Sequence, residues 1–315
     1  MNIIHIPVLK DEVYSLLKPE QSDELLIDAT VGEGGHAEMF LEKNHRLTVV
    51  GIDADAGILK KAESRLSRFG KRVELYNRWF NLFFKEYPED MKRPDKILFD
   101  LGISSYHYEE SLKGFTFQKN EPLDMRLEKD LEISAADIIN QYPEEELADL
   151  IYEYSEERYS RRIARAIVAE RAEQPIETTD RLENIIWKAV PEKYRHLKIH
   201  PATRTFQALR IAVNGELARL KSGLQSAFSV LGLGGRIGVI TFHSLEDRIV
   251  KYFFREKSRS CTCPPKWPIC KCGGKKIAQL INKKPIRPSE EEVAHNSASR
   301  SAKLRVIEKI DEEEL

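Results

Sequence analysis

The chain has 315 residues, too many for one small core, so we expect one large domain or two. It carries 50 Lys and Arg against 51 Asp and Glu, and a net charge of −1 excludes a global field that would attract a polyanion. No apolar run approaches the roughly 20 residues that a membrane-spanning helix needs, and the N-terminus lacks the pattern of a secretory signal. We therefore expect a cytoplasmic protein with no membrane partner.

The first hundred residues alternate between apolar runs and helical patterns. In chain order the pattern predicts strand 25–30, helix 35–43, strand 47–53, helix 56–69, strand 73–77 and strand 96–100. Strands that alternate with helices form a parallel sheet with right-handed crossovers, and ligands bind at the carboxyl ends of such strands. The predicted fold class is therefore α/β.

A different pattern begins after residue 105. From 134 to about 213 apolar residues recur at spacings of three and four, and three prolines separate successive helices. The α/β pattern then returns, with helix 217–231, strand 236–242, helix 246–255 and strand 304–310. We expect a discontinuous sheet domain over 1–108 and 212–315, and an all-helical, substrate-recognition insertion over 109–211.

The turn after the first predicted strand has the clearest ligand-binding pattern. An apolar run ends in Asp28, the chain turns through Gly32-Glu-Gly-Gly-His36, and the next strand ends in Asp53. Glycines let the backbone approach a ligand, and Asp53 can accept hydrogen bonds from both hydroxyls of a ribose. The spacing differs from the Gly-x-Gly-x-x-Gly of dinucleotide sites, and Glu33 would repel a pyrophosphate. The pattern favours the sulfonium S-adenosylmethionine over NAD, with a plain tight turn as the alternative.

A second polar turn, Asp100-Leu-Gly-Ile-Ser-Ser105, closes the fourth predicted strand at the same edge of the sheet. Methylation of an exocyclic amine needs hydrogen bonds that free the nitrogen lone pair, together with in-line positioning. Asp100 and Ser104 are therefore our candidate catalytic residues. The alternative is an aspartate that only caps a turn.

Further segments suit contacts with a nucleic acid. Phe115 or Phe117 could stack on a base, or could join the two domains. The residues that could hold phosphates or touch the target nucleotide are Arg126, Arg204, Arg210, His243 and Ser244. Between residues 255 and 287 ten Lys or Arg stand against one acid, which indicates a local polyanion site or a solvated loop.

The cysteines are clustered within twelve residues, at Cys261, Cys263, Cys270 and Cys272. In a reducing compartment four thiolates can close a tetrahedral zinc site, although a Cys-x-Cys spacing is tighter than usual. A structural zinc ion and a reduced, metal-free loop are both open.

Together these motifs resemble one family, the bacterial cytosine-N4 methyltransferases of 16S ribosomal RNA, known as RsmH or MraW. The matching segments follow the family's order along the chain: His5-Ile-Pro-Val-Leu, Gly32-Glu-Gly-Gly-His36, Asp100-Leu-Gly-Ile-Ser-Ser105, Gly114-Phe-Thr-Phe117, Pro122-Leu-Asp-Met-Arg126, His200-Pro-Ala-Thr-Arg-Thr-Phe-Gln207 and Phe242-His-Ser-Leu-Glu-Asp-Arg248. The resemblance implies a class I methyltransferase fold with a helical insertion. It also implies a cytidine in the decoding centre of 16S ribosomal RNA, or of the assembled small subunit, as the target.

The resemblance implies individual cofactor contacts as well, at Gly34, Gly35, His36, Asp53, Phe80 and Asp100. One more family contact follows the serine pair as Ser-Ser-Pro-Gln, where this chain has Ser104-Ser-Tyr-His107. His107 would replace the glutamine, and Tyr106 lacks the rigidity of proline. A DNA or small-molecule methyltransferase and a catalytically silent RNA-binding factor stay open as alternatives, as do monomer and homodimer.

Overall fold

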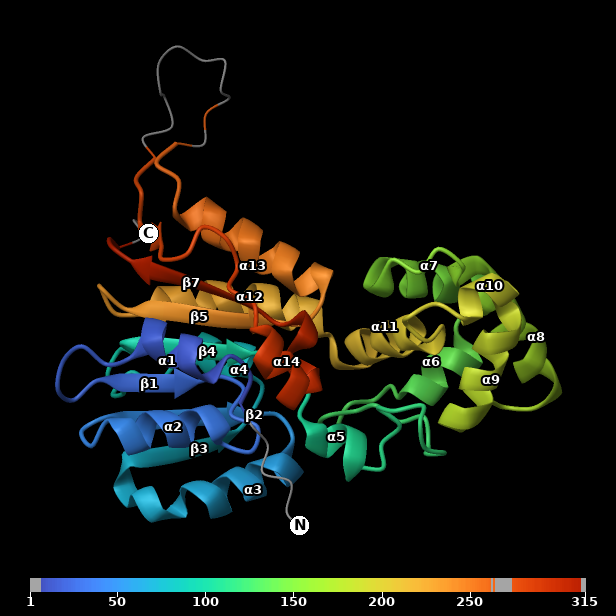
Figure 1. Ribbon diagram of the computed structural model, residues 1–315, viewed down its shortest axis with the longest axis horizontal. Helices are drawn as coiled ribbons and strands as arrows, with labels where there is room; N and C mark the ends of the chain where they lie inside the picture. Colours follow the sequence, from blue (N-terminus) through green and yellow to red (C-terminus); the bar gives the residue numbers. More distant parts are fainter. Residues whose placement is uncertain (1–6, 262, 264–273, 313–315) are drawn as a thin grey trace. The chain divides into compact units, whose positions relative to one another are not determined.

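The computed structural model describes residues 7–261, 263 and 274–312 (Figure 1). The chain divides into two compact units, one formed by Met1–Gly102 with Leu217–Leu315 and the other by Ile103–Glu216. The first unit holds a sheet and the second is helical. The junctions thus fall at 102/103 and 216/217, where the sequence predicts 108/109 and 211/212.

The first unit is built on a seven-stranded sheet in the order β3-β2-β1-β4-β5-β7-β6. The strands are β1 (Leu25–Asp28), β2 (Thr48–Asp53), β3 (Val73–Asn77), β4 (Lys96–Asp100), β5 (Arg236–Thr241), β6 (Ala278–Leu280) and β7 (Lys303–Lys309). β3 through β5 are parallel, whereas β7 runs antiparallel to both β5 and β6. The α/β prediction is confirmed, and β6 is the strand that the sequence does not predict.

Helices cover both faces of this sheet (Figure 1). They are α1 (Lys10–Leu17), α2 (Gly35–Lys43), α3 (Ala56–Leu66), η1 (Ser67–Arg72), α4 (Phe80–Lys85), α12 (Glu216–Val230), α13 (Ser244–Lys257), α14 (Glu290–His295) and η2 (Ser297–Ser301). Side chains alternate between the faces along each strand: Ile27 belongs to the core that includes residues of α4, α12 and α13, whereas Leu26 belongs to the core that includes residues of α1, α2 and α3. The sheet is therefore packed between two apolar cores, which fix the positions of its strand ends.

The second unit consists of α5 (Ser105–Glu109), α6 (Ala135–Gln141), α7 (Glu144–Ser155), α8 (Ser160–Glu173), α9 (Thr179–Ala189), α10 (Glu192–Arg195) and α11 (Ala202–Asn214). Helices α6 to α11 share one core, formed mainly by Ile, Leu and Ala side chains. The buried amide of Asn214 ties the loop before α6 to α11: it donates to the carbonyl of Met125 at 2.8 Å and accepts from the N–H of Leu127 at 2.9 Å. Across the described ranges of both units, no helix is long and apolar enough to cross a membrane.

Candidate active site

Three neighbouring parallel strands end in carboxylates, Asp28 on β1, Asp53 on β2 and Asp100 on β4. In register, Asp28 lies beside Gly51 of β2 and Leu98 of β4. Asp53 and Asp100 therefore extend two residues beyond Asp28 along their strands. Asp28 is set back into the sheet and is only 1% exposed, while the other two carboxylates lie at the edge.

Asp53 is held by the backbone around it. Its Oδ2 accepts from the N–H of Gly32 at 3.0 Å, and its Oδ1 accepts from the N–H of Asp55 at 2.9 Å. These bonds fasten the glycine turn to the end of β2. A carboxylate has about four acceptor positions, so Asp53 can still accept from ribose hydroxyls while it holds the turn.

Two glycines of the turn, Gly34 and Gly35, are required by the packing of the protein itself. Gly34 has φ 82°, and a Cβ there would lie 3.0 Å from the side chain of Leu66. A Cβ on Gly35 would lie 2.7 Å from the ring of Pro7. The backbone of the turn is therefore drawn close to its neighbours at the start of α2, which leaves peptide groups rather than side chains at the edge of the sheet.

His36, in the first turn of α2, lies beside the end of β4. Its Nε2 is 3.6 Å from Oδ2 of Asp100, and its side chain is 6% exposed. Both ring nitrogens of His36 and Oδ1 of Asp100 are buried without a hydrogen-bond partner among the described residues. The N–H of Asp100 donates to Oγ1 of Thr30 at 2.7 Å, which fixes the strand end. Buried polar atoms without partners are costly, so we expect a polar ligand to supply partners here.

Asp28 opens the glycine-turn pattern of the sequence, but the sequence assigns it no role in the site. Burial, together with the charges of Asp100 and Asp53, raises the pKa of Asp28 to about 7 against the opposing effect of His36. The only sequence signal is an acid at the end of an otherwise apolar strand. The edge of the sheet therefore gathers three carboxylates and one imidazole, an arrangement that favours a cationic ligand and disfavours a pyrophosphate.

The remaining proposed cofactor contacts, Phe80 and His107, and the candidate catalytic residue Ser104 also have structural roles. Phe80 begins α4, its ring meets Phe99 edge-on at 5.3 Å, and a Cβ on Gly223 would lie 2.5 Å from it. Ser104 caps α5, since its Oγ accepts from the N–H of Tyr106 at 3.2 Å. His107 is 4% exposed and packs with its ring 5.3 Å from that of Phe115. Ser104 and His107 belong to the helical unit.

Two of the three arginines expected to hold phosphates form ion pairs within the helical unit. Arg126 binds both oxygens of Asp124 at 2.7 and 3.0 Å, and Arg210 binds both oxygens of Glu216 at 2.8 and 2.9 Å. Bidentate pairs of this kind satisfy the guanidinium and neutralise its charge. Both arginines thus have partners within the protein, and a phosphate contact by either of them stays a prediction.

Arg204 is placed differently. Its side chain is 40% exposed, with one nitrogen 3.1 Å from the hydroxyl of Tyr194 and 3.5 Å from the fully buried carboxylate of Glu157. Burial raises the pKa of Tyr194 to about 12, with the hydrogen bond to Glu157 adding to the effect. The buried phenol and carboxylate hold Arg204 at the surface of the helical unit, where it can contact an anion.

The expected base-stacking role is not supported for Phe115, which is 6% exposed and part of the helical core. Phe117 is partly buried, and its ring stacks on His200 at 4.8 Å. His200 stacks on Trp187 from α9 at 5.3 Å. The phenylalanines thus stabilise the helical unit itself.

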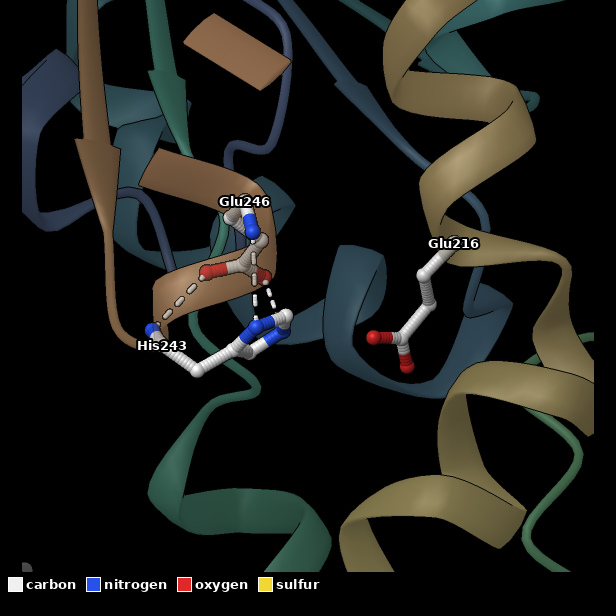
Figure 2. A group of neighbouring side chains, drawn as sticks. All are labelled: Glu216, His243 and Glu246. Atoms are coloured by element: carbon white, nitrogen blue, oxygen red, sulfur yellow. Dashed lines mark hydrogen bonds and ion pairs between the residues drawn. The ribbon is translucent and has the colours of Figure 1, made fainter. Parts of the chain in front are cut away.

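His243 caps α13. Its Nδ1 accepts from the N–H of Glu246 at 3.4 Å, and its Nε2 lies 3.1 Å from Oε1 of Glu246 (Figure 2). Oε2 of Glu246 accepts from the N–H of Phe242 at 2.8 Å. Glu246 is only 3% exposed. Ser244 is the first residue of α13 and is exposed. The structure thus gives His243 a local capping role, and its contact with the target nucleotide stays a prediction.

The cysteine cluster is described only in part. Cys261 is exposed, Cys263 is partly buried, and the N–H of Cys263 lies 3.4 Å from Sγ of Cys261. Cys270 and Cys272 lie outside the described residues, so the zinc site stays a prediction. In the neighbouring basic segment, Lys275 pairs with Asp311 at 2.5 Å, while Lys276, Lys283 and Lys284 are exposed.

The strand order, the antiparallel β7 at one side of a parallel sheet and the acid-rich edge define a class I, Rossmann-like methyltransferase. The second unit interrupts this sheet domain after β4. The chain belongs to the MraW methylase family, whose family model matches residues 2–310. The resemblance seen in the motifs is thereby confirmed.

Named relatives match over almost their whole length. A protein of Treponema denticola, called ribosomal RNA small subunit methyltransferase H, is 55% identical over 311 residues, which cover 99% of each chain. A protein of the same name from Heliobacterium mobile is 46% identical over 313 residues, which cover 98% of this chain and 100% of that one. The structure of an S-adenosylmethionine-dependent O-methyltransferase from Thermotoga maritima aligns with 100% of this chain and 70% of that one, at 12% identity and a TM-score of 0.41. A likeness as distant as this last one says nothing about activity.

Proposed function

We propose that this protein transfers a methyl group from S-adenosylmethionine to the exocyclic N4 amine of a cytidine in the decoding centre of 16S ribosomal RNA. The observation that carries the proposal is the group of Asp53, Asp100 and His36 at one edge of the sheet, where polar atoms of His36 and Asp100 are buried without a hydrogen-bond partner in the part of the chain that the structure describes. The relatives named as ribosomal RNA small subunit methyltransferases support the choice of substrate. A cytoplasmic location and action on the small subunit or its RNA follow from the same proposal.

The residues at the edge of the sheet fit this cofactor. When bound, S-adenosylmethionine supplies an electrophilic methyl group on a positively charged sulfur. Asp53 would accept hydrogen bonds from the ribose hydroxyls, and the peptide groups of Gly34 and Gly35 would meet the ligand at the start of α2. The carboxylates lower the free energy of a bound cation. Phe80 and His107 stay predictions based on the family's pattern.

Asp100 is the proposed catalytic residue. Its buried Oδ1 has no partner among the described residues and can accept a hydrogen bond from an N–H of the target amine. Such a bond draws the nitrogen lone pair out of conjugation with the ring and orients it toward the methyl group. Ser104 caps α5, so we propose that it shapes the turn after Asp100 rather than moving a proton.

The helical unit is proposed to bind RNA, with Arg204 as its exposed phosphate contact. Zinc at the four cysteines is a separate proposal, and its proposed role is to order the basic segment. Neither proposal is needed for the chemistry at the edge of the sheet.

Methyl transfer to three substrates tests the function. Labelled S-adenosylmethionine is incubated with small subunits, with naked 16S ribosomal RNA and with DNA, and modified nucleosides are identified by mass spectrometry. We expect N4-methylcytidine in the subunit or its RNA and none in DNA. Transfer to DNA alone would favour a DNA methyltransferase, and binding of RNA without any transfer would favour a catalytically silent assembly factor.

A further inference from the structure

Methylation of an amine leaves one proton to be placed. The nitrogen forms a bond to carbon and loses an N–H proton, while the electron pair of the broken C–S bond stays on sulfur and the sulfonium charge disappears. The reaction therefore removes the positive charge of the sulfonium and releases one proton from the amine. If the protein has the function proposed above, a group of the site must take up that proton.

Asp28 lies directly behind the proposed reaction centre. The register of β1 against β2 and β4 sets it two residues back from Asp53 and Asp100, and it is 1% exposed. Three charged or titratable groups face it, His36 from α2, Asp100 from β4 and Asp53 from β2. The N–H of Thr30 lies 3.4 Å from its Oδ1. Asp28 therefore reaches the edge of the sheet through these neighbours rather than through solvent.

The group formed by Asp28, Asp53, Asp100 and His36 has an excess of negative charge when no ligand is bound. Three carboxylates face one imidazole, and like charges in a buried site resist simultaneous ionisation. Burial, with the charges of Asp100 and Asp53, raises the pKa of Asp28 to about 7 against the opposing effect of His36. A sulfonium cation bound beside the cluster would lower that pKa, and conversion of the sulfonium to a neutral thioether would restore it.

We propose that Asp28 stores the proton that the target amine loses: it is ionised while the sulfonium is bound and protonated after the methyl group has been transferred. Asp100 accepts the N–H of the amine, and His36, with Nε2 3.6 Å from Oδ2 of Asp100, lies beside it to pass the proton inward. Because Asp28 lies two residues back from Asp53 and Asp100, it takes up the proton through its neighbours and would not itself contact the target amine. The cluster thereby favours the charged cofactor over its neutral product.

Calorimetry can count the protons directly. Binding of S-adenosylmethionine and of S-adenosylhomocysteine is measured at pH 7 in two buffers that differ in ionisation enthalpy. We expect release of about half a proton with the sulfonium, because a group with a pKa near 7 is about half protonated there, and close to none with the thioether. The affinity ratio of the two ligands should rise about tenfold between pH 6 and pH 8, since only the sulfonium expels the proton.

Two carboxylate-to-amide variants assign the effect. Asp28→Asn keeps the shape of the side chain but cannot ionise, so the release and the pH dependence should both vanish. Glu74→Gln changes an exposed carboxylate of β3 and should leave both as in the wild type. Equal release with the two ligands, or release that persists in Asp28→Asn, overturns the proposal.

The result also separates this inference from the proposed function. If neither ligand binds, the proposed function fails; if both bind without differential proton release, only the role of Asp28 fails. Should Asp28→Asn fail to fold, the wild-type comparison decides by itself, because the two ligands differ only in one methyl group and its charge.

Discussion

Asp53 offers the sharpest quantitative test of the site. In Asp53→Asn one carboxylate oxygen becomes an amide NH₂, so either the N–H of Gly32 or that of Asp55 loses its acceptor. The ribose would lose an acceptor at the same atom. A bound ribose hydroxyl that is buried without an acceptor costs about 1–3 kcal/mol of binding free energy. This cost corresponds to an increase of about 5- to 150-fold in the dissociation constant of S-adenosylmethionine.

The assay is isothermal calorimetry, paired with denaturant unfolding so that a loss of affinity can be separated from a loss of the fold. Glu63→Gln makes the same chemical change at an exposed position of α3 and should alter neither quantity. A folded Asp53→Asn protein that binds the cofactor within twofold of the wild type would refute the assignment of Asp53 to the ribose.

Four further outcomes are expected. Asp100→Ala should abolish or severely reduce methylation of small subunits while thermal unfolding stays cooperative, and a wild-type rate would rule out the proposed hydrogen bond to the amine. Charge reversal at Lys276 should weaken RNA binding and lower the slope of log affinity against log salt by about one; the same change at Lys275, which is already paired, should do less. Gly34→Ala should destabilise the protein more than Gly234→Ala, because both have positive φ and only Gly34 has a side chain within 4 Å of the added Cβ; equal losses by calorimetric unfolding would refute this steric argument. Protein purified without a metal-affinity tag should carry about one zinc ion per chain by elemental analysis, and a value near zero would exclude the cysteine site.

Periodicity in the sequence was sufficient to predict the parallel strands and the helical insertion. Both signals are local: apolar runs that end in acids or turns, and spacings of three and four. β6 has only three residues, and its pairing with β7 depends on a partner far along the chain, so no local pattern could predict it. The short helices α4 and α14 have six residues each, too few for a helical periodicity to be recognised in the sequence.

The roles of the arginines could not be predicted from the sequence for a related reason. Arg126 pairs with Asp124, two residues away in an irregular loop, and Arg210 pairs with Glu216 across the end of a helix. Whether an arginine forms an ion pair within the protein or can contact a ligand depends on the backbone conformation between it and the nearest acid. The composition of the sequence does not specify that conformation. The raised pKa of Asp28 could not be predicted either, because the groups that face it come from two other strands, β2 and β4, and from one helix, α2.

The interruption of the sheet also bears on how the chain reaches its native state. The strands β1 to β4 are complete before the helical unit has been synthesised, but β5, the next partner of β4, lies beyond it. An unstructured loop of that length carries an entropic cost of closure and leaves the edge of β4 open to wrong partners. Folding of the helical unit as an independent body would replace that loop before β5 emerges from the ribosome, and would make the insertion a determinant of folding yield as well as of substrate recognition.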